Sequence, residues 1–174
     1  MRMQKFEKII QKIDPTYRLI KTWQVKGGIS AEITGLEIGL PDGATQKLIV
    51  RRHGDDDFKG NPQIAAHEFH LLQFLKTEDI PVAKPYYLDE TDEILGRPYL
   101  VLEYIEGHTE FDPANLANFL LQFATNLAKI HCIHYSQSDF LAFCQSATIF
   151  IENFRAIIAQ VLMKNSWKRG FGRH

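Results

Sequence analysis

The first part of the chain carries the hydrophobic pattern of a helix followed by a small sheet. Apolar residues recur at helical spacing up to Asp14-Pro15, which predicts a helix that ends there. Stretches with the character of strands then follow at 19–25, 31–40 and 48–51, separated by turn sequences rich in glycine and aspartate. Strands joined by such short turns pair antiparallel, so the sequence predicts a meander.

The middle of the chain predicts one helix and two further strands. Asn61 suits an N-cap and Pro62 suits the first helical position, so we expect a helix that begins there and ends near Lys76. The segment IPVAKPYYLDE then predicts a loop leading into a fourth strand, and GRPYLVLEYIEG predicts a buried fifth strand. The residues expected on one face of the helix are Ile64, Glu68, Leu71, Leu72 and Leu75.

The rest of the chain has helical periodicity. Asp112-Pro113 is expected to cap a long helix, whose apolar stripe runs from Leu116 to Ile130. A last helix is predicted over 147–163, before an aperiodic basic tail. The predicted order is β-β-β-α-β-β followed by helices, which is an α+β arrangement.

Composition narrows the class of protein. Apolar residues make up 45% of the chain and charged residues 24%, which favours a packed core over disorder. The formal net charge of −1 gives no general attraction to nucleic acid or to an anionic membrane. Cys132 and Cys144 are the only cysteines, and the N-terminus lacks the pattern of a signal peptide. We therefore expect a cytoplasmic protein with neither nucleic acid nor membrane as partner.

Four blocks of sequence stand in a recognisable order: LIVRRHG, HEFHLLQFLKTEDIPVAKPYYLDE, ILGRPYLVLEYIEG and LLQFATNLAKIH. Together they resemble the aminoglycoside phosphotransferase family of small-molecule kinases, over about Tyr17 to His131. The resemblance implies a protein-kinase-like N-lobe, with a five-stranded antiparallel sheet and one packed helix, followed by the helices of a truncated C-lobe. It divides the chain into a nucleotide-binding N-lobe with its N-terminal helix, 1–105, and a hinge with a partial helical C-lobe and basic tail, 106–174.

The resemblance assigns a phosphate-contacting pair to Arg51 and Glu68. In this fold a cation on the third strand contacts the α- and β-phosphates of the nucleotide and is held by a glutamate on the following helix. Many kinases have lysine where Arg51 stands, and a guanidinium still pairs bidentately with carboxylate and phosphate. The alternative interpretation is an ordinary surface ion pair.

Two further stretches complete the implied nucleotide site. Gly27, Gly28 and Ser30 lie between the first two strands, where glycines let backbone N–H groups approach a phosphate and a serine hydroxyl adds a donor. The alternative for this stretch is a plain hairpin turn. The implied hinge, at which main-chain groups bind adenine, consists of Glu103, Tyr104 and Ile105.

The stretch HGDDDFKGN, 53–61, imitates the catalytic loop of a small-molecule kinase. Such a loop has an aspartate that orients the attacking hydroxyl group and a later asparagine that holds magnesium. The spacing from Asp55 to Asn61 does not match that pattern, and the stretch precedes the hinge instead of following it. We therefore expect a solvated acidic loop that ends in an N-cap, and we assign no catalytic residue to it.

The sequence past the hinge lacks the catalytic pattern of the family. Its aspartates are Asp112 and Asp139, and neither has an asparagine at useful spacing. The prediction is a truncated ATP-dependent phosphotransferase, inactive alone, which binds ATP weakly and would use Mg²⁺ only in a full-length relative. The alternative is a non-catalytic binding or oligomerisation module that self-associates through exposed C-lobe helices.

Histidines and cysteines are the remaining candidates for chemistry. His131, Cys132 and His134 could form a zinc site with Cys144, but no second close pair of ligands supports one, and no metal site is predicted. His67 and His70 flank Glu68 on the predicted helix and are expected to face solvent.

Overall fold

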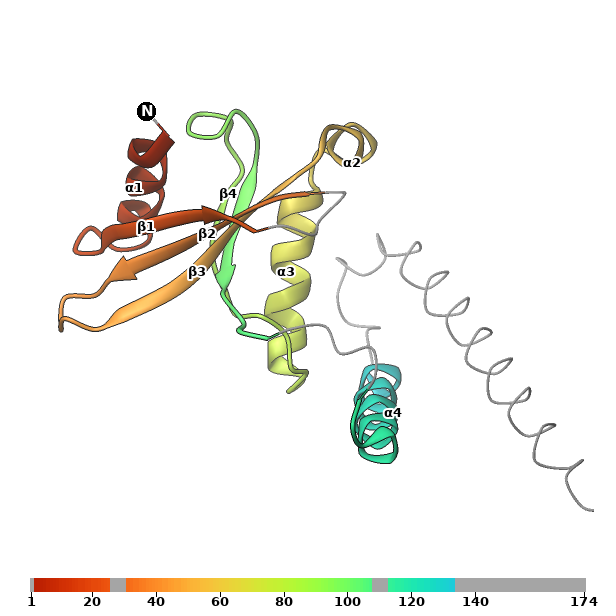
Figure 1. Cartoon of the computed structure of the whole chain (residues 1–174). Helices are drawn as coiled ribbons and strands as arrows, with labels where there is room; N and C mark the ends of the chain where they lie inside the picture. The colour runs from red at the N-terminus through yellow and green to blue at the C-terminus, as the bar shows by residue number, and fades with distance from the viewer. Residues whose placement is uncertain (1, 26–30, 108–112, 134–174) are drawn as a thin grey trace, which may run out of the picture. The chain divides into compact units, whose positions relative to one another are not determined.

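The computed structural model describes residues 2–25, 31–107 and 113–133. The chain divides into two units, Met1–Cys132 and Ile133–His174, and all the elements named below belong to the first. Its centre is a five-stranded sheet with helices on both faces (Figure 1). The helix predicted at 147–163 lies outside the described residues.

The sheet is wholly antiparallel and has the order β1-β2-β3-β5-β4. The last strand therefore inserts between β3 and β4. This architecture confirms the predicted α+β fold of five antiparallel strands. β3 is longer than predicted, because its polar residues at both ends also pair with β2. The bounds are β1 (Arg18–Gln24), β2 (Ala31–Gly39), β3 (Thr45–His53), β4 (Pro85–Asp89) and β5 (Tyr99–Glu103).

One face of the sheet is covered by α1 (Arg2–Ile13). Phe6, Ile9 and Ile10 of this helix are buried at helical spacing and pack on three strands. Burying one large apolar side chain contributes about 1.5–3 kcal/mol, so α1 is part of the core. The structure thus adds a second packed helix to the one that was predicted. The strand residues of this cluster are Leu36, Ile38, Leu48, Val50, Tyr99 and Val101.

The opposite face packs against α3 (Ile64–Thr77). Ala65 of this helix is buried against Leu100 and Leu102 of β5. Ile49 also packs here, while the residues before and after it on β3 belong to the α1 face. Side chains alternate along a strand in this way, so each strand supplies one set of residues to each helix.

A buried carboxylate ties α1 to the edge of the sheet. Asp89, at the end of β4, accepts hydrogen bonds at Oδ2 from Lys12 Nζ at 3.0 Å and from the Tyr99 hydroxyl at 2.9 Å. Its Oδ1 accepts the N–H and the hydroxyl of Thr91, at 2.9 Å and 2.6 Å. Burial raises the pKa of Asp89, but these donors more than offset it and lower the pKa to about 2. No sequence pattern had singled out this residue.

The acidic segment 53–61 was expected to be a loop, and this expectation is wrong. The segment contains a short helix, α2 (Asp55–Gly60), with aspartates in its first turn, where the helix dipole favours negative charge. Asn61 ends this helix, and its N–H donates to the carbonyl of Asp57 at 2.9 Å. Its side chain accepts the N–H of Gln63 at 3.1 Å, so it begins a turn and is not the N-cap of α3.

The long helix predicted beyond the hinge is present as α4 (Leu116–Cys132). Asn115 caps it, because its side-chain oxygen accepts the N–H of Asn118 at 3.0 Å. The cap predicted at Asp112 lies outside the described residues. None of the described helices combines the length and the apolar character that crossing a bilayer requires.

Candidate functional site

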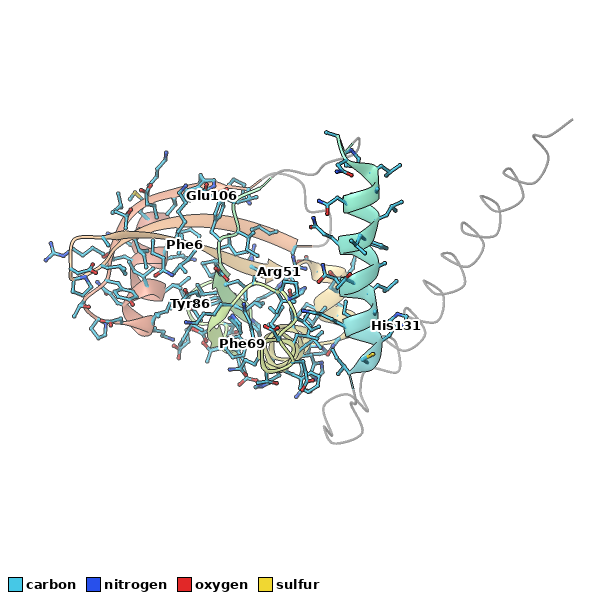
Figure 2. The ribbon with its side chains drawn as sticks, turned by 90° about the horizontal axis from the view of Figure 1, so that it is seen from below. Phe6, Arg51, Phe69, Tyr86, Glu106 and His131 are labelled. Carbon is cyan, nitrogen blue, oxygen red and sulfur yellow. The ribbon has the colours of Figure 1, made fainter. Side chains whose placement is uncertain are left out.

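Two neighbouring arginines of β3 point to opposite faces of the sheet. Arg51 contacts Glu68 of α3, whereas Arg52 contacts Glu32 of β2 and donates to the carbonyl of Leu95 at 3.0 Å. This follows from the alternation of side chains along the strand. Only Arg51 therefore belongs to the α3 face, where Figure 2 labels it at the end of the sheet.

The structure brings the predicted pair Arg51 and Glu68 together. Arg51 Nε donates to Glu68 Oε2 at 3.0 Å, and each side chain is 26% exposed. Among the described residues, no hydrogen bond or ion pair engages the two terminal Nη atoms of Arg51. A guanidinium held through Nε presents these two amines as a fork, which matches two oxygens of a phosphate group.

Glu68 is held in its charged form. Burial of the carboxyl group raises its pKa, but the contacts with His53 and Arg51 lower the pKa by more, so it lies below the ordinary value. The carboxylate is therefore ionised at neutral pH. Charge attraction then adds to the hydrogen bond that holds Arg51 in place.

His53 is a third member of this cluster, and the sequence analysis had not given it this role. It ends β3 with a 7% exposed side chain, and its Nε2 lies 2.7 Å from Glu68 Oε2. The two groups lack the alignment of a hydrogen bond, and within the described residues Nε2 has no hydrogen-bond partner. The pattern that could have revealed His53 is its spacing, because residues two apart on a strand share a face.

The α3 face of the sheet continues across β2 to β1, where it carries the aromatic side chain of Trp23. Trp23 pairs with Gly35, Gly35 with Ile49, and Ile49 with Leu102. Residues directly opposite one another share a face, and the last two belong to the α3 side. The Trp23 indole lies against Gly35, where an added Cβ would be 2.2 Å from Cε2. Glycine is therefore required for the indole to lie there.

The predicted hinge residues have different surroundings. Glu103 is used structurally, since its Oε2 accepts the N–H of Lys84 at 3.0 Å and its own N–H donates to the Lys84 carbonyl at 2.8 Å. The Tyr104 ring meets Trp23 edge-on, with ring centroids 5.6 Å apart and planes at 69°. Ile105 is 63% exposed. The hinge therefore begins beside the aromatic side chain of Trp23.

The predicted glycine loop, 26–30, lies outside the described residues, and with it Gly27, Gly28 and Ser30. The residues on both sides of it are paired in the sheet. The N–H of Val25 donates to the carbonyl of Ile33 at 3.0 Å, and Ala31 is opposite His53 in the pairing of β2 with β3. The loop is thus joined to strand ends next to the Arg51 cluster.

The helix α2 within the acidic segment has contacts of its own. Asp55 forms an ion pair with Arg97 of the β4–β5 connection. The same guanidinium lies 5.6 Å from the centroid of the Phe58 ring. These contacts attach α2 to the β4–β5 connection, which gives Asp55 a structural role.

The histidines of α3 differ in exposure. His67 is half-buried, with Nδ1 3.0 Å from Asn61 Nδ2, so the expectation that it faces solvent is wrong, whereas His70 is exposed. In the described part of the chain, no three metal-ligating side chains come together. His134 and Cys144, considered as zinc ligands with His131, lie outside that part.

Comparisons with known proteins agree with this architecture. The family model of the phosphotransferase enzyme family matches residues 38–156. The crystal structure of a Ralstonia eutropha protein assigned as an aminoglycoside phosphotransferase is similar in fold, with a TM-score of 0.55 and 19% sequence identity. The similarity covers 76% of this chain and only 39% of that one. No curated protein matches. Because the family match covers more than half of the chain, this protein belongs to the phosphotransferase enzyme family.

Proposed function

We propose that this lobe binds ATP for phosphoryl transfer to a hydroxyl group of a small molecule. Membership of the phosphotransferase family supports the class of reaction. The single observation that carries the nucleotide-binding role is the contact of Arg51 with Glu68. In kinase-like folds, a strand cation held by a helix glutamate positions the nucleotide phosphates. We call these two residues the phosphate clamp.

The surroundings of the phosphate clamp fit a nucleotide. The terminal amines of Arg51 would bind the α- and β-phosphates, with the backbone of 26–30 contributing further donors. Trp23 and Tyr104 offer aromatic surface to the base. The main-chain N–H of Ile105 has no main-chain acceptor among the described residues, so it is available to the edge of the base.

We infer that these 174 residues on their own bind nucleotide without transferring phosphate. Transfer requires side chains that hold Mg²⁺ and an aspartate that orients the acceptor hydroxyl. Past the hinge the sequence has only Asp112 and Asp139, and neither has the required spacing. Without metal ligands the triphosphate charge is poorly neutralised, so we expect a dissociation constant on the order of millimolar, with little preference for ATP over ADP.

Titration of ATP into ¹⁵N-labelled protein tests this proposal. The largest chemical-shift changes should occur at Arg51, at the Trp23 indole and at the hinge, and they should saturate at concentrations of about 1–10 mM. Asp55→Ala serves as the control, since Asp55 contacts Arg97 and not the phosphate clamp. Changes that are absent, or that gather around Asp55, would contradict the proposed site.

A coupled ATPase and kinase assay with alcohol and aminoglycoside acceptors tests the inferred inactivity. We expect no turnover above background. Turnover that is abolished by chelating Mg²⁺ would show that the inference of inactivity is wrong, while leaving the nucleotide site intact.

The second candidate is a module that self-associates. It is favoured by the apolar side chains that α4 exposes, which include Leu116, Phe119, Leu120, Leu121 and Phe123. Exposed apolar surface of this kind promotes association with a second copy. Light scattering over a range of protein concentrations separates the candidates: the mass of two copies supports self-association, and the mass of one copy throughout contradicts it.

A further inference from the structure

One carboxylate oxygen is approached by two donors from the same strand. Glu68 Oε2 lies 3.0 Å from Arg51 Nε and 2.7 Å from His53 Nε2. Arg51 and His53 are two residues apart on β3 and therefore project from the same face. Glu68 thus connects a buried imidazole to a half-buried guanidinium.

His53 is the most firmly placed of the three groups. Its side chain is 7% exposed, against 26% for both Arg51 and Glu68. Its backbone is fixed in the ladder opposite Ala31. Glutamate and arginine have several rotatable bonds, so holding them in one orientation costs conformational entropy. Contacts with fixed neighbours are needed to offset that cost. A donor in a fixed place beside Glu68 restricts the positions that the carboxylate can take.

A role in packing alone does not explain the imidazole. Burying an N–H group without an aligned acceptor costs free energy, so a purely structural position would favour an apolar side chain. Ile49, which lies on the same face of β3, is such a residue. At His53 the acceptor that the described residues place beside Nε2, at 2.7 Å, is the charged oxygen that also receives Arg51.

We propose that His53 is a positioning residue of the phosphate clamp, which directs its Nε2–H at Glu68 and so fixes the carboxylate that holds Arg51. The consequence for ligand binding rests on the proposed nucleotide function, since of these three residues only Arg51 would contact the phosphates.

His53→Met and His53→Gln form a matched pair of variants for the test. Both side chains are unbranched and similar in size, and only glutamine carries an N–H donor that can reach Glu68. The readout is the Nε–H resonance of Arg51 in ¹H–¹⁵N spectra, which needs no nucleotide. In His53→Met we expect this proton to exchange with water about tenfold faster, because Glu68 loses a contact that helps to hold it against Arg51. In His53→Gln we expect exchange near the wild-type rate. Unchanged exchange in His53→Met would overturn the proposal.

Ligand titrations separate this role from a general loss of structure. His53→Met should weaken ADP binding about tenfold while leaving adenosine binding unchanged, because only ADP uses Arg51. An equal loss for both ligands would overturn the positioning role. If wild-type protein binds no ADP but the response of the Arg51 resonance is as expected, the proposed function fails and the positioning role stands.

A measurement on the unaltered protein completes the test and does not depend on a variant that folds. Long-range ¹H–¹⁵N spectra report which ring nitrogen of His53 carries a proton. We expect Nε2 to carry a proton and its resonance to move in Glu68→Gln. An Nε2 without a proton cannot donate to Glu68 and would overturn the proposal.

Discussion

Asp89→Asn removes the charge of the carboxylate that joins α1 to the sheet. In the folded protein the pKa of Asp89 falls from the ordinary value of 3.8 to about 2. The difference, 3.8 − 2, is about 1.8 units, and at 1.36 kcal/mol per unit it corresponds to about 2.5 kcal/mol. Asparagine keeps the size and an acceptor for Thr91, but it cannot form the ion pair with Lys12. We therefore expect the free energy of unfolding at neutral pH to fall by about 2–3 kcal/mol.

The stabilisation by Asp89 depends on pH with a defined sign. Because the pKa is lower in the folded than in the unfolded protein, the contribution is complete above about pH 4 and is lost as the pH falls through about 2. Urea unfolding of both proteins at about pH 7, 4 and 2.5 measures the gap between them. The gap should shrink toward acid. A gap of the same size at every pH would show that packing, and not charge, accounts for the loss, and the reasoning would be refuted.

The remaining predictions concern the two faces of the sheet. Gly35→Val would place a Cβ 2.2 Å from Trp23 Cε2, so we expect a loss of about 1–3 kcal/mol in urea unfolding and a changed tryptophan emission. Unchanged emission would place the indole elsewhere. Ile10→Ala, in the buried face of α1, should cost about 2–5 kcal/mol, whereas the exposed control Ile20→Ala should cost about 0.5 kcal/mol. Equal losses for the two would contradict the packing of α1 in the core.

The sheet and its helices could be predicted because their patterns are local. Alternation and helical spacing are properties of a few consecutive residues, and they located all five strands and the helices before and after them. The start of α3 was misplaced for a physical reason. Asn61 followed by Pro62 suits the start of a helix, yet Asn61 also suits the end of α2, and local preference does not rank these positions.

The candidate site was predictable only where the fold fixes the position. Arg51 and Glu68 were expected to meet because the family that the sequence resembles has a cation on the third strand held by a glutamate on the following helix, and the structure brings the two side chains together. Trp23 and Asp89 were missed because their partners come from distant parts of the chain, whereas His53 was missed because the resemblance assigns no role to that position. His53 meets α3, Trp23 needs Gly35 on the next strand, and Asp89 gathers donors from α1 and β5.

The central claim is that the α3 face of β3 binds the nucleotide phosphates, and two adjacent substitutions test it most directly. Arg51→Ala and Arg52→Ala remove neighbouring guanidinium groups from opposite faces of one strand. ATP affinity is measured for both by following chemical shifts in a titration. We predict that Arg51→Ala weakens ATP binding by about tenfold or more, while Arg52→Ala binds as the wild type does. Equal affinities in the two variants, or a loss confined to Arg52→Ala, would contradict the claim.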